Sequence, residues 1–308
     1  MDINDNEIAL AVKGLNKSYG SHDVLKNLDL ELKKGAVLGL VGLNGSGKTT
    51  TIECLLGLQS ANSGLISLLT FSPQSLCEAN GKVIGVFDTP SLHPNLTVHQ
   101  SLEHAALLCE KIVRTPQQVE TLLGIERFSK FKIRNLSLGN KRRASIAHAL
   151  LGGPDLIILD EPFNGLDAGG VDDVLELIRY LNQQEGTSFL LSSHQLPYLE
   201  NICSHVAILH HGKICVNGAI DTLLSDAGLT IKLRTSNGSA AMAVVNSNNK
   251  IEILSSESEG YINLSLSDMN SAELNRLLVE NQVAVDELIV KTPSLTDLFR
   301  EITSENNA

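Results

Sequence analysis

A glycine-rich run with one lysine and one threonine is the part of this 308-residue sequence that most directly points to chemistry. Residues 42–49 read GLNGSGKT and fit the pattern GxxxxGK[ST]. They follow an apolar strand-like run and precede a helical pattern, so backbone N–H groups and the positive end of a helix dipole would face one anion. We expect Lys48 to neutralise the outer phosphates of a nucleotide and Thr49 to ligate Mg²⁺.

A second candidate site lies where an apolar run ends in two adjacent acids. Residues 156–161 read LIILDE and predict a buried strand that ends at Asp160 and Glu161, just before Pro162. Successive side chains of a strand point to opposite faces, so the two acids can share a site only if the chain bends there. We predict that Asp160 holds Mg²⁺, usually through its water shell. We assign Glu161 to polarising the attacking water, a general-base role that contributes about 10²–10⁴ in rate.

The hydrophobic pattern predicts the elements that must position these residues. Apolar runs over residues 7–42 predict strands, and residues 48–58 predict a helix. Residues 96–151 carry apolar side chains at helical spacing and are predicted to form a helical insert. From residue 155 onward strand and helix patterns alternate, which is typical of a parallel sheet covered on both faces. The sequence therefore predicts an α/β fold.

The texture of the sequence changes near Ser225, because residues 235–260 are rich in serine and asparagine. We therefore predict one domain over residues 1–225 and a second over residues 226–308. The second domain is expected to be small and α+β. Its expected elements, in chain order, are the strands TIKLRT, MAVVNS, IEILS and YINLSLS, the helix Ser271–Glu280, the strand ELIVK and the helix Leu295–Ile302.

Composition and charge exclude several classes of protein. The formal net charge of −11 disfavours a partner coated in phosphate, so we expect no nucleic acid. No apolar run approaches the roughly 18 residues of a membrane span. The start, MDINDNEIAL, lacks the basic region and apolar run of a secretory signal, which predicts a cytoplasmic location. Five cysteines without a CxxC pair suit neither a disulfide framework nor a zinc site.

Four further segments, taken with the two sites above, make the chain resemble the ATPase subunit of an ABC transporter. Residues 136–140 (LSLGN) resemble the signature motif LSGGQ, and residues 164–167 (NGLD) resemble the D-loop. His194 resembles the switch histidine, and Tyr19 resembles the aromatic residue that stacks on adenine. The resemblance implies the P-loop NTPase ABC ATPase fold, with a mixed sheet core, a helical insert and an N-terminal β-subdomain, followed here by the small C-terminal α+β domain.

The resemblance also implies the cofactors, ATP and Mg²⁺, and a set of site residues. Ser137 and Gly139 would contact the γ-phosphate bound by the other protomer of a dimer. Hydrolysis is assigned to Lys48, Glu161 and His194, and the metal to Thr49, Asp160 and Asp88. The residues expected to bind the nucleotide are Tyr19, Gly42, Asn44, Gly45, Ser46, Gly47, Lys48, Thr49, Thr50, Ser137, Gly139 and Asp167.

The sequence departs from the family pattern in two places. The signature has leucine for its first glycine and asparagine for its glutamine. In the loop where the family often has glutamine, either Asp88 or Thr89 fills that position. The stretch PSLHPNLT that follows, and the closing PSLTDLF at residues 293–299, are similar to export ATPases of the bacitracin-resistance and lantibiotic-immunity type. The basic run Lys141-Arg142-Arg143 after the signature is expected to be a solvated helix face.

The chain carries one phosphate loop and one signature motif, whereas the family needs two of each. The resemblance therefore implies pairing with a second copy or a paralogous ATPase subunit around two ATP molecules. The pair would drive a separately encoded membrane permease, for export, from the inner face of the cell membrane. Two alternatives stay open. One is a soluble, non-transport ABC ATPase, and the other is a non-hydrolysing nucleotide switch or immunity module, which the altered signature and Asp88 motivate.

Overall fold

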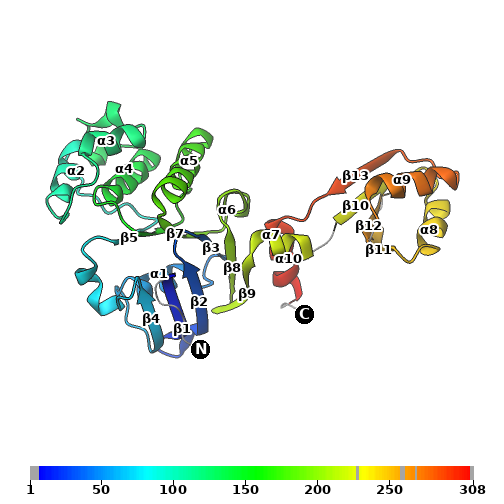
Figure 1. Ribbon diagram of the computed structural model, residues 1–308, viewed down its shortest axis with the longest axis horizontal. Coiled ribbons are helices and arrows are strands. Elements are labelled where there is room, and N and C mark those ends of the chain that lie inside the picture. Colours follow the sequence, from blue (N-terminus) through cyan, green and yellow to red (C-terminus); the bar gives the residue numbers. More distant parts are fainter. Residues whose placement is uncertain (1–6, 227–228, 257–260, 268, 306–308) are drawn as a thin grey trace. The chain divides into compact units, whose positions relative to one another are not determined.

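The computed structural model describes residues 7–226, 229–256, 261–267 and 269–305 (Figure 1). It divides the chain into two compact units, Met1–Ile220 and Asp221–Ala308, so the units meet a few residues before the boundary that the sequence predicted. Residues 1–6, on which the expectation about a secretory signal rested, lie outside the described residues. Within the described part of the chain, no helix is both long enough and apolar enough to span a bilayer.

The larger unit is built on a six-stranded mixed sheet. Five strands run parallel and the last is antiparallel to its neighbour. Three central strands are buried at every residue, as expected for a parallel sheet covered on both faces. In order across the sheet the strands are β5 (Val83–Val86), β6 (Leu156–Asp160), β7 (Ser188–Ser193), β3 (Val37–Val41), β8 (His205–His210) and β9 (Lys213–Ala219).

A three-stranded antiparallel sheet forms the N-terminal β-subdomain of the same unit. Its order is β2 (His22–Lys33), β1 (Ile8–Tyr19) and β4 (Ser63–Leu68). Its apolar face packs with α1 (Lys48–Leu55) and the six-stranded sheet in one core that is rich in leucine. This core fixes α1, and with it the phosphate-loop sequence that precedes α1, between two sheets.

Helices follow the central strands and also form the predicted insert. After β6 comes α5 (Ala168–Glu185), and after β7 comes α6 (Leu196–Ile202). The insert consists of α2 (Val98–Ala106), α3 (Pro116–Leu122) and α4 (Leu138–Leu150), with short 3-10 turns between α3 and α4, and these helices lie side by side (Figure 1). Threonines with a glutamine three residues later cap α2 and α3 through complete capping boxes. The predicted α/β fold with a helical insert is confirmed.

The smaller unit contains a four-stranded antiparallel sheet. Its order is β11 (Ile251–Ser256), β12 (Tyr261–Leu266), β10 (Leu229–Arg234) and β13 (Glu287–Lys291). The helices of this unit are the continuation of α7 (Ile220–Asp226), α8 (Gly238–Asn246), α9 (Ser271–Glu280) and α10 (Leu295–Glu305). Aliphatic side chains from this sheet, α8 and α9 form a separate core.

One expected strand of the smaller unit is wrong. The segment MAVVNS, residues 242–247, lies almost entirely in α8. The side chain of Asn237 caps this helix by accepting a hydrogen bond from the Ala240 N–H at 3.2 Å. Ala241 and Val245, four residues apart, are both fully buried in the core. Helical spacing and the cap therefore outweigh the β-branched valines that suggested a strand.

Candidate nucleotide-binding site

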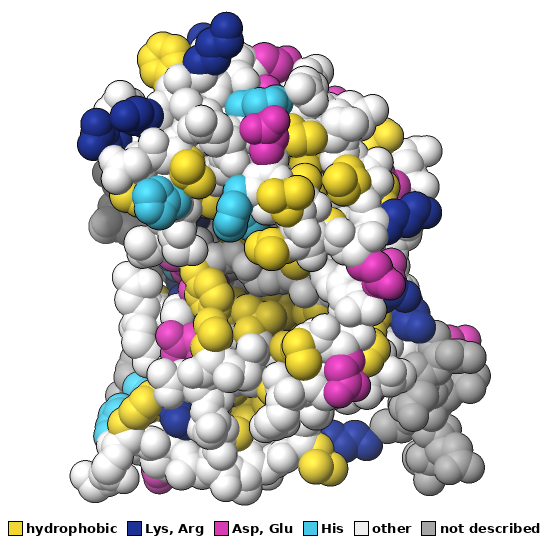
Figure 2. Space-filling view, turned by 90° about the vertical axis from the view of Figure 1, so that its left-hand side faces the viewer, with side chains coloured by type: hydrophobic (Ala, Val, Ile, Leu, Met, Phe, Trp, Pro, Cys, Tyr) yellow, Lys and Arg dark blue, Asp and Glu magenta, His cyan; other side chains and the backbone are white. Residues whose placement is uncertain are grey.

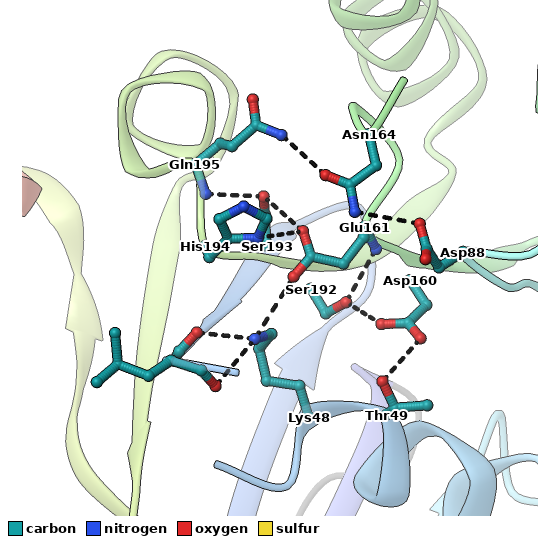
Figure 3. A network of polar contacts seen from close by, with 12 residues as sticks. Lys48, Thr49, Asp88, Asp160, Glu161, Asn164, Ser192, Ser193, His194 and Gln195 are labelled. Atoms are coloured by element: carbon teal, nitrogen blue, oxygen red, sulfur yellow. Dashed lines mark hydrogen bonds and ion pairs between the residues drawn. The ribbon is translucent and has the colours of Figure 1, made fainter. Parts of the chain in front are cut away.

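The predicted chemistry gathers at one edge of the central sheet because of the strand order. The strands β6, β7 and β3 are direct neighbours and run parallel, so their carboxyl ends lie together. The phosphate loop follows β3, the two acids end β6, and His194 follows β7. Ligands of open α/β sheets bind outside the carboxyl ends of the strands, and Figure 3 shows these side chains converging there.

The phosphate loop has a backbone that depends on its glycines. Gly47, the residue before α1, has φ of 111°, a conformation that other residues rarely adopt. A Cβ atom on Gly42 would lie 2.4 Å from Ser46 Oγ and 2.6 Å from a backbone carbonyl oxygen, so no larger residue fits. Ser46 Oγ is buried and has no hydrogen-bond partner among the described residues. An unsatisfied buried hydroxyl in a loop at a helix N-terminus fits a phosphate ligand.

Lys48 is 6 % exposed, and its ammonium group is held inside the loop. Its Nζ donates to the carbonyl oxygens of Gly42 at 2.7 Å and Leu43 at 3.3 Å. The same Nζ lies 3.4 Å from Glu161 Oε1. The positive charge that the sequence assigned to phosphate therefore faces the predicted general base across the site.

Asp160 is 2 % exposed and accepts hydrogen bonds on both carboxylate oxygens. Thr49 Oγ1 donates to Oδ2 at 3.0 Å, and Ser192 Oγ donates to Oδ1. Burial raises the pKa of Asp160, the two hydrogen bonds oppose that rise, and the charge of Glu161 adds to it. Hydroxyl and carboxylate oxygens this close together are ligands that suit Mg²⁺, so these residues fit the metal.

Glu161 directs its carboxylate into the same site as Asp160, although the two residues are adjacent on a strand. Its φ of 48° is left-handed, so the predicted bend lies at Glu161 itself. Oε2 accepts from Ser193 Oγ at 3.2 Å and lies 3.0 Å from Nδ1 of His194 (Figure 3). His194 is partly exposed, with 43 % of its side chain accessible, whereas Glu161 is buried.

These residues surround a pocket of about 510 Å³. Val24, Leu43 and Asn164 also line the pocket, although the sequence had not assigned them. The predicted residues that line it are Asn44, Gly45, Gly47, Lys48, Thr49, Thr50, Asp88, Glu161 and His194. Sequence reasoning also missed Ser192 and Ser193, although the run LLSSH that leads to His194 could have indicated them.

Tyr19 does not line this pocket. It ends β1 and is 45 % exposed. The ammonium group of Lys17 lies 4.7 Å from the centre of its ring, and Lys17 itself is 9 % exposed. The Lys17 Nζ also donates to the Ser60 carbonyl oxygen at 2.7 Å. The Tyr19 ring is therefore in contact with the Lys17 ammonium group, whose position is fixed by its hydrogen bond to Ser60.

Ser137 and Gly139 of the signature motif and Asp167 of the D-loop also lie outside the pocket of their own chain. Ser137 caps α4, with its Oγ accepting from Asn140 N–H at 3.3 Å. Asp167 caps α5, and its side chain is 89 % exposed. A Cβ on Gly139 would lie 3.0 Å from the Gly165 carbonyl oxygen, so the two motifs touch each other. None of Ser137, Gly139 and Asp167 is among the pocket's lining residues.

Asp88 lines the pocket, whereas Thr89 lines a separate groove between β5 and α4. Asp88 Oδ1 accepts from Arg142 at 2.7 Å and from Asn164 at 3.1 Å. Burial alone would raise the pKa of Asp88, but these two hydrogen bonds outweigh it, and the pKa is lowered. The expectation that Arg142 is solvated is wrong, because its side chain is 2 % exposed.

Known proteins are similar to this chain in sequence and in fold. The sequence pattern of the ABC transporter family matches residues 25–164. The ABC transporter ATP-binding protein YdbJ of Bacillus subtilis (strain 168) is 32 % identical over 301 residues, covering 97 % of this chain and 96 % of YdbJ. The bacitracin transport ATP-binding protein BcrA of Bacillus licheniformis is 31 % identical over 291 residues, covering 92 % and 94 %. A solved ATP-binding subunit of an ABC transporter superimposes with a TM-score of 0.65 and 30 % identity, covering 71 % of this chain and 93 % of that one.

The chain therefore belongs to the ABC transporter family. It is an ATP-binding subunit with ATPase activity, as the sequence predicts, and the P-loop NTPase ABC fold is confirmed.

Proposed function

We propose that this subunit hydrolyses Mg²⁺-bound ATP to power a separately encoded permease, and that the direction of transport is export. One observation carries the catalytic part. The Glu161 carboxylate stands in the phosphate-loop pocket between the imidazole of His194 at 3.0 Å and the ammonium of Lys48 at 3.4 Å. A carboxylate so placed is suited to accept a proton from water next to a bound phosphate.

ATP binding would rearrange the contacts of Lys48. Its ammonium now bonds carbonyl oxygens of its own loop and pairs with Glu161. Phosphate oxygens are stronger, charged partners for an ammonium group. When Lys48 turns to them, the Glu161 carboxylate loses its ion pair and becomes free to act on water. Phosphoryl transfer depends mainly on such positioning and on stabilisation of charge.

Thr49 and Asp160 are the residues that would hold Mg²⁺. The ion supplies positive charge to the phosphate oxygens when it is bound. The Thr49 hydroxyl now donates to Asp160 at 3.0 Å, and that contact would be replaced by bonds to the metal or its waters. Asp88 could contribute only Oδ2, because Arg142 and Asn164 both bond Oδ1.

A second copy, or a paralogous subunit, would complete the site. Ser137, Gly139 and Asp167 lie outside the pocket of their own chain, which is where residues that act on a partner's nucleotide would lie. An ATP-binding cassette of similar fold, with a TM-score of 0.63, has been solved as a dimer in a post-hydrolysis state bound to ADP and phosphate. The exposed ring of Tyr19 is available to stack on adenine at its own site.

The permease would dock on the face shown in Figure 2. That face is hollowed near its centre, and apolar side chains gather there. A groove of about 200 Å³ runs between β5, the loop after it and α4, with Phe87, Pro90 and Leu92 among its lining. The groove begins one residue from Asp88, which lines the nucleotide pocket, so a docked segment would sense that pocket.

A role in transport is supported by the names of relatives, and export by the name of the Nod factor export ATP-binding protein I of Cupriavidus metallidurans, which is 33 % identical over 214 residues. A position at the inner face of the membrane would follow from docking on the proposed permease. BcrA is described as a bacitracin transport protein. The lantibiotic transport ATP-binding protein SrtF of Streptococcus pyogenes is 32 % identical over 213 residues, covering 69 % of this chain and 91 % of SrtF. Both names describe movement of peptide antibiotics, and the PSLHPNLT stretch of this chain favours the same subclass.

The first experiment tests catalysis by phosphate release from Mg²⁺-ATP. Glu161→Gln should abolish release while retaining ATP binding, because an amide cannot accept the proton. Glu103→Gln, an exposed change in the helical insert, is the matched control and should hydrolyse ATP like the wild type. Hydrolysis by Glu161→Gln at the wild-type rate would refute the assigned base. Absence of release from folded wild-type protein would favour a nucleotide switch.

The second experiment tests the partner. Tagged Glu161→Gln protein, expressed in its native host and loaded with ATP, would be recovered from membranes in mild detergent and analysed by mass spectrometry. Recovery of a multi-span membrane protein in stoichiometric amount supports the permease. Recovery of soluble protein, ribosomes or DNA alone would contradict it.

A further inference from the structure

A buried guanidinium links three segments of the catalytic site. Arg142 lies in α4, the helix that begins at the signature motif, and its side chain is 2 % exposed. Burying an unpaired charge is strongly unfavourable, so a buried arginine needs partners that accept its hydrogen bonds. Its burial requires an explanation, because the neighbouring basic residues Lys141 and Arg143 remain more accessible.

The partners of Arg142 all belong to the site rather than to α4. One terminal nitrogen donates to the carbonyl oxygen of Glu161. The other donates to the carbonyl oxygen of Asp88 and to its Oδ1 at 2.7 Å. Asn164 of the D-loop donates to the same Oδ1 at 3.1 Å, and Gln195 donates to Asn164 at 3.1 Å (Figure 3). The two terminal nitrogens of Arg142 therefore connect the Asp88 loop to Glu161, while Arg142 itself belongs to a third segment, α4.

The contact with Glu161 matters because the backbone of Glu161 is strained. A left-handed φ is unfavourable at a non-glycine residue and persists only where surrounding contacts impose it. The Glu161 N–H donates to the carbonyl oxygen of Ser192 at 3.0 Å and to its Oγ at 3.1 Å. The Glu161 carbonyl oxygen accepts from Arg142 and from the Asn164 N–H. Arg142 is the one charged group among these four contacts.

We propose that Arg142 is a positioning residue. It ties the backbone of Glu161 to α4 and to the Asp88 loop, so that the carboxylate reaches its working geometry only when both are in place. The proposal rests on the proposed role of Glu161 as general base. In this arrangement a partner's nucleotide at the α4 N-terminus, and a permease beside the Asp88 loop, both act on one bond network.

The test separates positioning from packing. Arg142→Lys keeps the charge but cannot span both segments, because a single ammonium lacks the planar fork of arginine. We expect kcat for Mg²⁺-ATP to fall at least about ten-fold, since small displacements of a catalytic group cost up to about 10² in rate. The dissociation constant of a fluorescent ATP analogue should change less than about three-fold, because the hydrogen bonds that Arg142 makes with described residues go to Asp88 and Glu161 rather than to the phosphate loop.

Arg114→Lys is the matched control. Arg114 is also largely buried, pairs with Glu185 and donates to the Leu150 carbonyl oxygen near the other end of α4. It should lose thermal stability like Arg142→Lys and keep the wild-type kcat. If Arg142→Lys does not fold, Arg142→Gln is measured instead, because it removes the buried charge and leaves the half-exposed Asp88 in place, and the same fall in kcat is expected.

A kcat that falls less than ten-fold in the folded Arg142 variants, or a fall matched by Arg114→Lys, would overturn the proposal, as would an equal loss of nucleotide affinity. Glu161→Gln, measured in parallel, distinguishes a failure of the proposed general base from a failure of the proposed positioning role. If Glu161→Gln still hydrolyses ATP, the proposed base is wrong. If only the Arg142 variants retain full kcat, the base stands and the positioning role is wrong.

Discussion

Ser192 offers a test of how the site controls the charge of Asp160. Its hydroxyl is fully buried and donates to Asp160 Oδ1. In Ser192→Ala the carboxylate loses that donor, whereas the Glu161 N–H keeps the Ser192 carbonyl oxygen at 3.0 Å. The change therefore removes one hydrogen bond to a charged group, which is worth about 1.5–3 kcal/mol, together with the second bond of the Glu161 N–H, at 3.1 Å to Ser192 Oγ.

Ser188, at the other end of the same strand, gives the comparison. It is also buried, but its Oγ accepts from the uncharged Gly35 N–H at 2.9 Å, a bond worth about 0.5–1.5 kcal/mol. A unit of this size loses about 2–4 °C of Tm per kcal/mol. We expect Ser192→Ala to lower Tm by about 3–12 °C and Ser188→Ala by about 1–6 °C, measured by differential scanning calorimetry without nucleotide.

The same substitution should move the pH profile. The Ser192 hydrogen bond holds the pKa of Asp160 down against the effect of burial. Without that bond the pKa rises further, so the acid limb of kcat/KM for ATP should shift to higher pH in Ser192→Ala and not in Ser188→Ala. Equal losses of Tm together with superimposable pH profiles would show that Ser192 only fills space.

Two further predictions follow from charges in the site. The pKa of Asp160 is raised, so its ionisation costs stability above the unfolded pKa of about 3.9, whereas the lowered pKa of Asp88 contributes stability there that is lost as the pH falls. Asp160→Asn should therefore raise Tm at pH 7, by a difference that shrinks as the pH falls toward ~4. Asp88→Asn should lower Tm at pH 7, by a difference that is lost only as the pH falls below ~4, and opposite signs would contradict the electrostatics. Lys17→Met removes the ammonium group 4.7 Å from the centre of the Tyr19 ring and with it a cation–π interaction worth about 0.5–1 kcal/mol. We expect it to weaken ATP binding about two- to five-fold in a titration with a fluorescent analogue. Lys13→Met, on the exposed side of the same strand, is the control and should leave the affinity unchanged.

The sequence predicted those parts of the site that depend on residues close together in the chain. The phosphate loop, the acids that end β6 and His194 after β7 each follow a strand within a few residues, and strand order alone brings them together. These features needed no knowledge of distant contacts.

The parts that sequence reasoning missed depend on contacts between distant segments. Arg142 is buried because Asp88 and Glu161, 54 and 19 residues away, accept its hydrogen bonds. A basic run on a helix carries no sign of such partners. The valines of α8 have high β propensity and therefore indicate a strand. The helix is favoured instead by the burial of Ala241 and Val245, which depends on the sheet that they face.

The carboxylates around Lys48 bear on which form of ATP the site accepts. Glu161 already pairs with that lysine, and Asp160 adds a second negative charge beside Thr49. A tetra-anion that arrives without a cation meets two carboxylates that hydrogen bonds hold in place, and like charges repel. We therefore expect the two acids to favour the nucleotide whose charge is already partly neutralised over the bare one.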